Sequence, residues 1–426
     1  MNLSKSQAII FVGIAAFVIF LALAILGIIP IFNSSTTTPP VKGQLTIWGI
    51  DNQEAFRDAI DSYASLYKDL HIAYKQIDPN NYENILVDAL ASHSGPDIFM
   101  FHRSWLQKHG NKVVPLDSTQ FPILKLRQLY PDIVEKDFVS NGKIYALPLY
   151  LDSLALFYNK DIFNNKGIAV TPTTWDDFKL LVPFLTTYDT AHQIQKSAAA
   201  IGGSDKSITV APDILSLLML QSGSGIAKTS SYGNGINFDQ QAGSGFNFYL
   251  QFSNPTNNYY TWSDSLNNYL DAFGAGNTAM IFGYARDINN IKSKSPFLNF
   301  DIIPAPQFNP NQPVNYADYW GLAVSNQSPY PQYAWDFINY MTTDPQNISS
   351  YLKATNLPPA IRTMVAQYQS DPVLNAFAKQ SLTAQAVPQQ DIFAYNQAIS
   401  NMIEYVLSGK LTVDGALREA QAELNH

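Results

Sequence analysis

"LPLYLDSLALFYNKDIF", residues 147–163, is a predominantly apolar run in which one carboxylate, Asp152, lies where a buried strand would pass. An unpaired charge inside a protein core is energetically costly. Asp152 therefore needs either a partner within the protein or a position where the strand emerges into a cleft that receives a ligand. The stretch predicts a buried strand whose one charge has a specific purpose.

The residues that precede this stretch alternate between strand and helix patterns. Residues 44–50, QLTIWGI, form a short β-branched run, after which Phe56, Ile60 and Tyr63 recur at helical spacing. The alternation continues to GPDIFMF at 95–101, a strand pattern entered through Gly-Pro. Strands that alternate with helices indicate an α/β fold with mixed, mostly parallel sheets flanked by helices.

Ligands of such sheets bind beyond the carboxyl ends of the strands. In this chain those ends are WGIDN at 48–52 and FHRSW at 101–105. The C-terminal half adds short strand patterns at TAMIFGYA, FDIIPAPQ and YWGLAVS, and it ends in helical patterns. At 426 residues the chain is long enough for two lobes with separate cores.

The composition excludes several classes of function. The net charge of −8 and the lack of any run of lysine or arginine argue against a nucleic-acid partner. The sequence contains no cysteine, which excludes disulfides, thiol catalysis, cysteine metal sites and a lipid-modified N-terminal cysteine.

The N-terminal region predicts a membrane anchor. Residues 8–29 carry no charge and, at about 1.5 Å per residue, would span a hydrocarbon core of about 30 Å as a helix. Residues 1–7 would then be a short cytoplasmic N-terminus, and residues 30–43, small, polar and proline-bearing, an extended linker. A cleaved signal peptide is the alternative, although its apolar region is usually only about 7–15 residues long.

The motifs of common enzymes are incomplete in this sequence. SGSGIAKT at 222–229 lacks the glycines that close a phosphate loop around phosphate, and GAGNTA at 274–279 lacks the third glycine of a dinucleotide site. His102 and His109 have no clear acidic third ligand, and no H-E-x-x-H or G-x-S-x-G occurs. We therefore expect no metal and no cofactor.

One enzymatic alternative stays open at this stage. Asp51, Asp97 and Asp152 could converge as the paired carboxylates of a glycoside hydrolase, and sequence spacing does not set their separation.

Aromatic residues at strand ends suggest a binding function instead. Sugar rings have an apolar face that packs on an aromatic ring and an edge of hydroxyls that pairs with polar side chains. Trp175 and Trp335 lie in amphipathic helical patterns and are predicted to be core residues. The aromatic residues at strand ends or beside glycine breaks are Trp48, Trp105, Tyr150, Tyr284, Tyr319 and Trp320.

The motifs of residues 43–426 together resemble those of the extracellular solute-binding proteins of bacterial ATP-binding-cassette importers. The resemblance is strongest to the branch that binds sugars and oligosaccharides. The segments that carry it are LTIWG, GPDIF, NGKIYALPLYLDSLALFYNKDIFNNKGI, TPTTWDDF, AFGAGNTAMIFGY, IIPAP, YWGLAVS, YAWDFINYMTTD and NLPPAIR.

This resemblance implies a periplasmic-binding-protein-like clamp that closes on its ligand by hinge motion. Lobe one would comprise residues 44–151 and 321–350, and lobe two residues 152–320 and 351–426. LYLDSLALFYN would be the first segment to cross between the lobes and YWGLAVS the second.

The resemblance also implies a set of ligand-binding positions. They lie in the loops after the first strand and after PDIF, on the first crossing strand, after AMIFG, at the start of the second crossing and in PPAIR. The matching residues here are Trp48, Asp51, Asn52, Arg103, Ser104, Trp105, Tyr150, Asp152, Tyr284, Arg286, Tyr319, Trp320 and Arg362.

By resemblance, the chain is expected to be a non-enzymatic receptor, anchored in the cell membrane with its soluble part in the periplasm or at the cell surface. Its expected partners are a small-molecule ligand, namely a mono- or oligosaccharide, and permease subunits with a separate ATPase. A sensory receptor built on the same clamp is the alternative within this fold.

Overall fold

The computed structural model describes residues 43–67, 69–224, 226–230, 233–387 and 391–425. The segments predicted as cytoplasmic N-terminus, anchor and linker lie outside these ranges, apart from Gly43, which begins the first strand. Within the described ranges, no helix combines the length and the apolar character needed to cross a bilayer.

The chain separates into a small and a large compact unit. The described part of the small unit consists of residues 43–44, 64–67 and 69–71, which include the last residues of one helix and the first residues of two strands. The large unit contains residues 45–63 and 72–426, and the residues that line the pocket described below belong to it.

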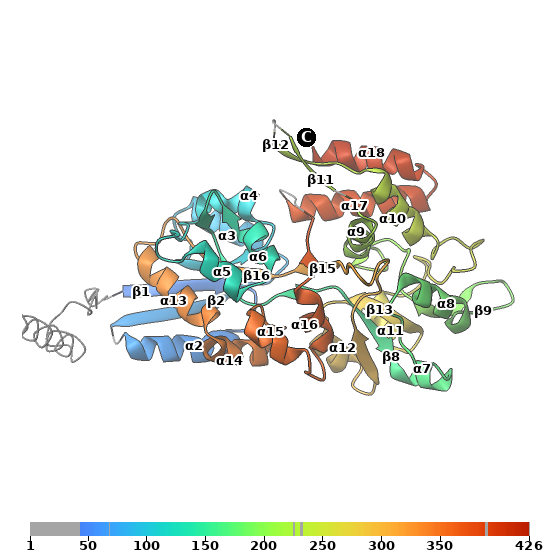
Figure 1. The fold of residues 1–426 in the computed structure, drawn as a ribbon, viewed down its shortest axis with the longest axis horizontal. Helices are drawn as coiled ribbons and strands as arrows, with labels where there is room; N and C mark the ends of the chain where they lie inside the picture. The colour runs from blue at the N-terminus through green and yellow to red at the C-terminus, as the bar shows by residue number, and fades with distance from the viewer. Residues whose placement is uncertain (1–42, 68, 225, 231–232, 388–390, 426) are drawn as a thin grey trace, which may run out of the picture. The chain divides into compact units, whose positions relative to one another are not determined.

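Lobe one is built around a five-stranded sheet (Figure 1). Its strand order is β2 (Leu70–Gln76), β1 (Gly43–Gly49), β3 (Ile98–His102), β16 (Trp320–Val324) and β6 (Leu147–Pro148). The associated helices are α2 (Gln53–Leu66), α3 (Tyr82–Ala91), α4 (Leu106–His109), η1 (Gly110–Lys112), α5 (Ile123–Leu129), α6 (Asp132–Phe138), α13 (Pro331–Thr343) and α14 (Pro345–Thr355). A short hairpin joins β4 (Val139–Ser140) to β5 (Lys143–Ile144).

Lobe two is built around a second five-stranded sheet. Its strand order is β14 (Phe300–Ile303), β8 (Ala155–Asn159), β13 (Thr278–Gly283), β10 (Ile194–Ala199) and β9 (Thr187–Tyr188). The helices are α7 (Lys160–Asn165), α8 (Trp175–Leu185), α9 (Ala211–Gln221), α10 (Gln240–Leu250), α11 (Tyr269–Gly274), α12 (Asp287–Lys294), α15 (Arg362–Tyr368), α16 (Asn375–Ser381), α17 (Ile392–Leu407) and α18 (Val413–Leu424). Strands β11 (Ala227–Ser230) and β12 (Gly233–Ile236) form a separate hairpin.

The prediction of mostly parallel sheets is wrong, although the α/β class is confirmed. Among the described pairings, β1 with β3 and β10 with β13 are parallel, while β16 runs antiparallel to both β3 and β6. In lobe two, β8 runs antiparallel to β13 and β14. Strands β8 and β16 enter their sheets directly from the connecting strands β7 and β15, without a crossover helix. Parallel neighbours in a sheet need a crossover connection, usually a helix, between them.

A third, small sheet connects the lobes. The chain leaves β6, passes through β7 (Asp152–Ser153) into β8, and returns through β15 (Asn315–Asp318) into β16. Strands β7 and β15 pair antiparallel with Asp152 opposite Asp318, and β17 (Ala384–Gln385) extends the sheet. The second crossing is therefore β15, whereas YWGLAVS forms a strand within the lobe-one sheet.

The local sequence explains how α8 is positioned. Thr174 and Asp177 form a reciprocal capping box at its N-terminus, which satisfies two backbone N–H groups. Trp175 then packs against Phe178 and Phe282 and is only 1% exposed. Trp335 on α13 is likewise buried, so both predicted core tryptophans are confirmed.

Candidate ligand-binding pocket

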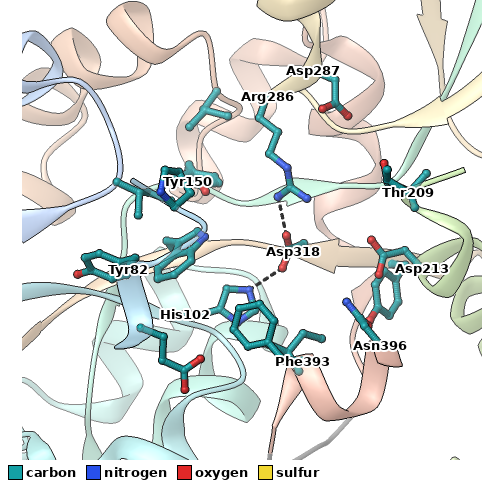
Figure 2. Close-up of a pocket in the computed structure, with 18 of the residues that line it drawn as sticks. Tyr82, His102, Tyr150, Thr209, Asp213, Arg286, Asp287, Asp318, Phe393 and Asn396 are labelled. Carbon is teal, nitrogen blue, oxygen red and sulfur yellow. Dashed lines mark hydrogen bonds and ion pairs between the residues drawn. The ribbon is translucent and has the colours of Figure 1, made fainter. Parts of the chain in front are cut away.

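A cavity of about 570 Å³ is lined by residues of both lobes and of the connecting strands (Figure 2). Lobe one and the connecting strands contribute Ile50, Asp51, Pro79, Tyr82, Glu83, His102, Trp105, Tyr150, Tyr316, Asp318 and Trp320. Lobe two contributes Thr209, Val210, Asp213, Tyr269, Leu270, Arg286, Asp287, Leu357, Ile392, Phe393 and Asn396. Asp51 follows the carboxyl end of β1, and His102 ends β3, which is the position expected for a ligand site in a sheet of this kind.

Three side chains linked by hydrogen bonds and an ion pair cross the cavity. Asp318 on β15 lies between His102 Nε2, at 2.6 Å from its Oδ1, and the Arg286 guanidinium, which donates to its Oδ2 (Figure 2). Burial raises the pKa of Asp318, but Arg286 and His102 offset this and hold the pKa well below its usual range. Asp318 is thus an ionised carboxylate fixed on the connecting strand β15.

His102 is held in one tautomer by its neighbours. Burial lowers its pKa, and the Asp318 carboxylate only partly opposes this effect, so the imidazole is neutral at physiological pH. A carboxylate can only accept, so Nε2 carries the proton, and Nδ1 then accepts from the Ser104 hydroxyl at 2.8 Å.

An aromatic wall lies beside these three side chains. The ring centroids of Trp105 and Trp320 are 5.1 Å apart, with their planes at 77°. Tyr82 stacks on Trp105 at 5.9 Å, and the His102 ring lies edge-on to Trp320 at 4.9 Å. Tyr82, Trp105 and Trp320 all line the cavity, but Trp105 and Tyr82 are buried, whereas Trp320 is partly exposed and has the most accessible ring of the three.

Two further carboxylates, one from each lobe, offer hydrogen-bond acceptors. Asp51 Oδ2 accepts from the Tyr351 hydroxyl at 2.6 Å, and Asp213 Oδ2 accepts from the Tyr284 hydroxyl at 2.9 Å. Burial raises the pKa of each to about 6, and the tyrosine hydrogen bond partly offsets the rise. No described residue donates to the other carboxylate oxygen of Asp51 or Asp213, which leaves both free to accept from a ligand.

Asp152, the carboxylate of the apolar run at 147–163, has its partners within the protein. It is fully buried, is not among the cavity-lining residues, and accepts from the backbone N–H groups of Ser153, Ala285 and Arg286 at 2.8, 3.1 and 3.3 Å. Burial raises its pKa to about 7. Asp152 therefore fastens the connecting strand β7 to the turn that carries Arg286.

The structure brings five of the predicted site residues to the cavity. They are Asp51, Trp105, Tyr150, Arg286 and Trp320. The other eight are not among the lining residues, namely Trp48, Asn52, Arg103, Ser104, Asp152, Tyr284, Tyr319 and Arg362. Which of the thirteen touch a ligand stays a prediction.

Four of the residues outside the cavity support those that line it. Tyr284 donates to Asp213 and stacks beneath Arg286, whose guanidinium carbon is 4.1 Å from its ring centroid. Ser104 donates to His102. Arg103, in the turn after β3, is buried and donates from Nη2 to the hydroxyl of the lining residue Tyr316 at 3.4 Å. Tyr319, between the lining residues Asp318 and Trp320, is buried and its hydroxyl donates to Asp137.

The remaining three have local structural contacts. Lys75 Nζ lies 4.2 Å from the ring centroid of Trp48. Asn52 accepts from the Glu54 N–H at the start of α2. Arg362 donates to the Tyr130 carbonyl and to the Asp132 carboxylate, as a link between the start of α15 and lobe one.

The glycoside-hydrolase alternative does not fit these positions. Asp97 accepts from Thr46 N at 2.8 Å, at the start of the parallel strands β1 and β3, whereas Asp51 follows the far end of β1. Five residues of strand separate them by roughly 16 Å, beyond the about 5–9.5 Å that paired carboxylates need. Asp152 is fully buried and cannot complete the pair.

Sequence reasoning missed six residues that shape the cavity, namely Tyr82, His102, Asp213, Asp318, Phe393 and Asn396. Asp318 could have been predicted from the alternation of side chains along a strand, in which every second residue faces the same side. Asp318 and Trp320 are two residues apart and reach the cavity, whereas Tyr319 between them must face away. Asp213 and Asn396 lie on helices far along the chain, where no local pattern marks a ligand site.

Comparisons with known proteins agree with this architecture. The family model for "Bacterial extracellular solute-binding protein" matches residues 58–376. The melibiose/raffinose/stachyose-binding protein of Bacillus subtilis is 27% identical over 166 residues, which are 38% of this chain and 38% of that protein. The maltotriose-binding protein of Pyrococcus abyssi is 25% identical over 143 residues, which are 32% of this chain and 30% of that protein. The chain thus spans about a third of the length of these curated relatives.

Solved structures match over most of the chain. The sugar-binding protein of Xanthomonas citri has a TM-score of 0.75 at 18% identity, with 90% of this chain and 96% of that chain covered. The cyclic α-maltosyl-1,6-maltose binding protein of Arthrobacter globiformis has a TM-score of 0.73 at 18% identity, with 91% and 98% covered. Likeness at this identity establishes the two-lobe fold, and together with the family match over residues 58–376 it shows that the chain belongs to the bacterial extracellular solute-binding protein family.

Proposed function

We propose that this protein captures a carbohydrate in the pocket and delivers it to the permease of an ATP-binding-cassette importer. The observation that carries the proposal is the partly exposed Trp320 ring beside the acceptor carboxylates Asp51 and Asp213. A sugar ring presents an apolar C–H face that packs on an aromatic ring and hydroxyls that donate to carboxylates. The cavity of about 570 Å³ falls in the usual size range of small-molecule sites.

The names of the similar proteins support a saccharide as the ligand. The relatives are named for melibiose, raffinose, stachyose and maltotriose, and one structural neighbour was solved with maltotetraose. These proteins are binding proteins, which supports a receptor that changes no bond in its ligand. The permease and its ATPase would be separate chains.

The connecting strands support a hinge as the means of capture. Lobe closure would bend the chain at β7 and β15, whose pairing joins the two lobes. For the lobe assignment we propose residues 44–151 and 321–355 as lobe one, and residues 152–320 and 356–426 as lobe two. The boundary predicted after residue 350 is moved because α14 continues to Thr355.

We also propose that residues 8–29 anchor the protein in the cell membrane, with the lobes in the periplasm or at the cell surface. The uncharged composition of this segment and the extracellular family support the proposal. Fractionation tests it. The full-length chain should be found in the membrane fraction, and recovery of a soluble mature form shortened at its N-terminus would contradict the anchor.

A ligand screen tests the function. The full-length chain is purified in a detergent without a sugar head group, and its melting temperature is measured with melibiose, raffinose, maltotriose, mannobiose, amino acids and polyamines. A bound ligand at a hundredfold excess over its Kd stabilises the protein by about 2.7 kcal/mol. Stabilisation by a saccharide without release of reducing ends is the expected result. Stabilisation only by amino acids or polyamines would contradict a carbohydrate ligand, and turnover would contradict a receptor.

A further inference from the structure

The first turn of α17 forms a part of the cavity wall that the sequence did not indicate. Ile392, Phe393 and Asn396 line the cavity from this turn (Figure 2). Phe393 and Asn396 are three residues apart and so lie on the same side of the helix. Phe393 is 60% exposed, so most of its ring is accessible to a bound molecule.

Asn396 contributes an unused acceptor to the same wall. Its side-chain oxygen Oδ1 is buried, and no described residue donates a hydrogen bond to it. Leaving a buried amide oxygen without a donor costs free energy. An exposed aromatic ring and an unsatisfied acceptor on one helix turn match the two surfaces of a sugar, its apolar face and its hydroxyl edge.

This turn is fastened to lobe one by an ion pair beside the cavity. Lys108 on α4 contacts Asp391 Oδ2 at 2.5 Å and Glu83 Oε1 at 2.6 Å. The other oxygen of Asp391, Oδ1, accepts from the N–H groups of Phe393 and Ala394 and caps α17. Asp391 therefore uses one oxygen to begin the helix and the other to hold it against lobe one.

We propose that the first turn of α17 is a ligand-contacting wall of the pocket, where Phe393 packs on the face of a sugar ring and Asn396 accepts from a hydroxyl, and that Lys108 positions this turn through Asp391. Lys108 touches no ligand in this arrangement. The inference rests on the proposed carbohydrate function and adds the residues that would set affinity on the lobe-two side.

The contact residues are tested by calorimetric titration of the full-length chain with the saccharide that stabilises it most in the ligand screen. Phe393→Ala should weaken affinity about tenfold, because it removes an aromatic platform, while Phe393→Tyr should retain most of it. Phe297→Ala is the matched control, since Phe297 is 97% exposed and does not line this cavity. Asn396→Leu keeps the side-chain volume, removes the acceptor and should weaken affinity independently.

The positioning role of Lys108 is tested by the salt dependence of the same affinity. Raising ionic strength from about 0.01 M to about 1 M shortens the screening length from about 30 Å to about 3 Å. The affinity of the wild type should fall several-fold over this range, that of Lys108→Met should be weaker and flat, and Lys108→Arg should restore the wild-type dependence. Asp391→Asn, which preserves the helix cap, should behave as Lys108→Met does.

The outcomes separate this inference from the proposed function. Saccharide binding by the wild type with unchanged affinity in Phe393→Ala and Asn396→Leu would overturn the contact wall and leave the function standing. Equal salt dependence in wild type and Lys108→Met would overturn the positioning role. No saccharide binding by the wild type would overturn the proposed function and this inference with it.

Discussion

At the scale of single residues, Asp152 is a buried carboxylate that holds parts of the candidate binding site in position. Its carboxylate oxygens accept hydrogen bonds from three backbone N–H groups, two of which belong to the turn that carries Arg286. Burial raises its pKa from 3.8 to about 7, so the folded state binds a proton more tightly than the unfolded state does. Its contribution to stability is therefore greatest when it is protonated and declines as pH rises from about 4 to about 7.

Replacement of Asp152 should reveal this titration. Asparagine cannot ionise, so only the wild type should lose stability as this site titrates. The difference in free energy of unfolding, wild type minus Asp152→Asn, should fall by a few kcal/mol between about pH 4 and pH 7 and be level above pH 8. Urea unfolding of the ligand-free protein across this range is the measurement.

Asp176→Asn is the control, because its side chain is 89% exposed and its exposed contact with Lys179 should contribute at most about 1 kcal/mol to stability. A pH-independent difference for Asp152→Asn, combined with loss of ligand binding at unchanged stability, would make Asp152 a ligand contact instead.

Asp51 and Asp213 give ligand binding its own pH dependence. The pKa of each is raised by burial to about 6, and a protonated carboxyl is a weaker acceptor than a carboxylate. Affinity for a neutral saccharide should therefore be level above about pH 7 and fall as pH decreases through 6 toward 5. Calorimetric titration at each pH measures this. Affinity that stays constant from pH 7.5 to 5 would show that neither carboxylate accepts from the ligand in its ionised form.

At the scale of elements, close helix packing depends on one glycine of the α10 pattern QQAGSG. A Cβ added to Gly245 would lie 2.9 Å from backbone atoms of Leu218 and Met219 on α9. A Cβ added to Gly243 would meet only the flexible end of Leu417, at 3.6 Å. A methyl group thus fits at Gly243 but not at Gly245, although both residues lie in the same helix.

Alanine substitutions should separate them. Gly245→Ala should lower the free energy of unfolding by about 1–3 kcal/mol, because α10 must move away from α9. Gly243→Ala should leave it unchanged or raise it by up to about 1 kcal/mol, because alanine favours the helix. Denaturant unfolding of both variants is sufficient. Equal effects of the two substitutions would show that α9 and α10 do not pack at this distance.

Much of the element order could be predicted from the sequence, and the direction of the strands could not. Hydrophobic patterns indicated β1 and α2, which each bury one regular face, and β3 and β16, which are short apolar runs buried on both faces. The pairing of β16 with β3 joins residues more than two hundred positions apart, and no local pattern encodes whether such strands run parallel.

The candidate site was predictable only where it follows strand ends. Asp51, Trp105 and Trp320 lie at such ends and do line the cavity. Tyr319 was predicted together with its neighbour Trp320, but successive side chains of an extended strand point to opposite sides, and Tyr319 faces Asp137. Arg103 lies in the turn after β3, with its guanidinium against the Tyr316 hydroxyl. The helix residues Asp213 and Asn396 reach the cavity only through the tertiary arrangement.

At the scale of the whole molecule, the connecting strands and the candidate ligand site share residues. Asp318 pairs across from Asp152 on the connecting strands and also holds Arg286 and His102 in the cavity. Two carboxylates opposite each other would repel, and the Arg286 turn satisfies both. Ligand contacts to Arg286 or Asp318 would thus act directly on the strands that we propose as the hinge.

The central claim is that this pocket binds a saccharide with Trp320 as its aromatic platform. Isothermal titration of the full-length chain with the most stabilising saccharide, compared with the same titration of Trp320→Ala, tests it most directly. The account predicts one saccharide bound per wild-type chain and an affinity weakened about tenfold or more in the variant, with the variant still folded. Equal affinity in both proteins, or no saccharide binding by the wild type, would contradict it.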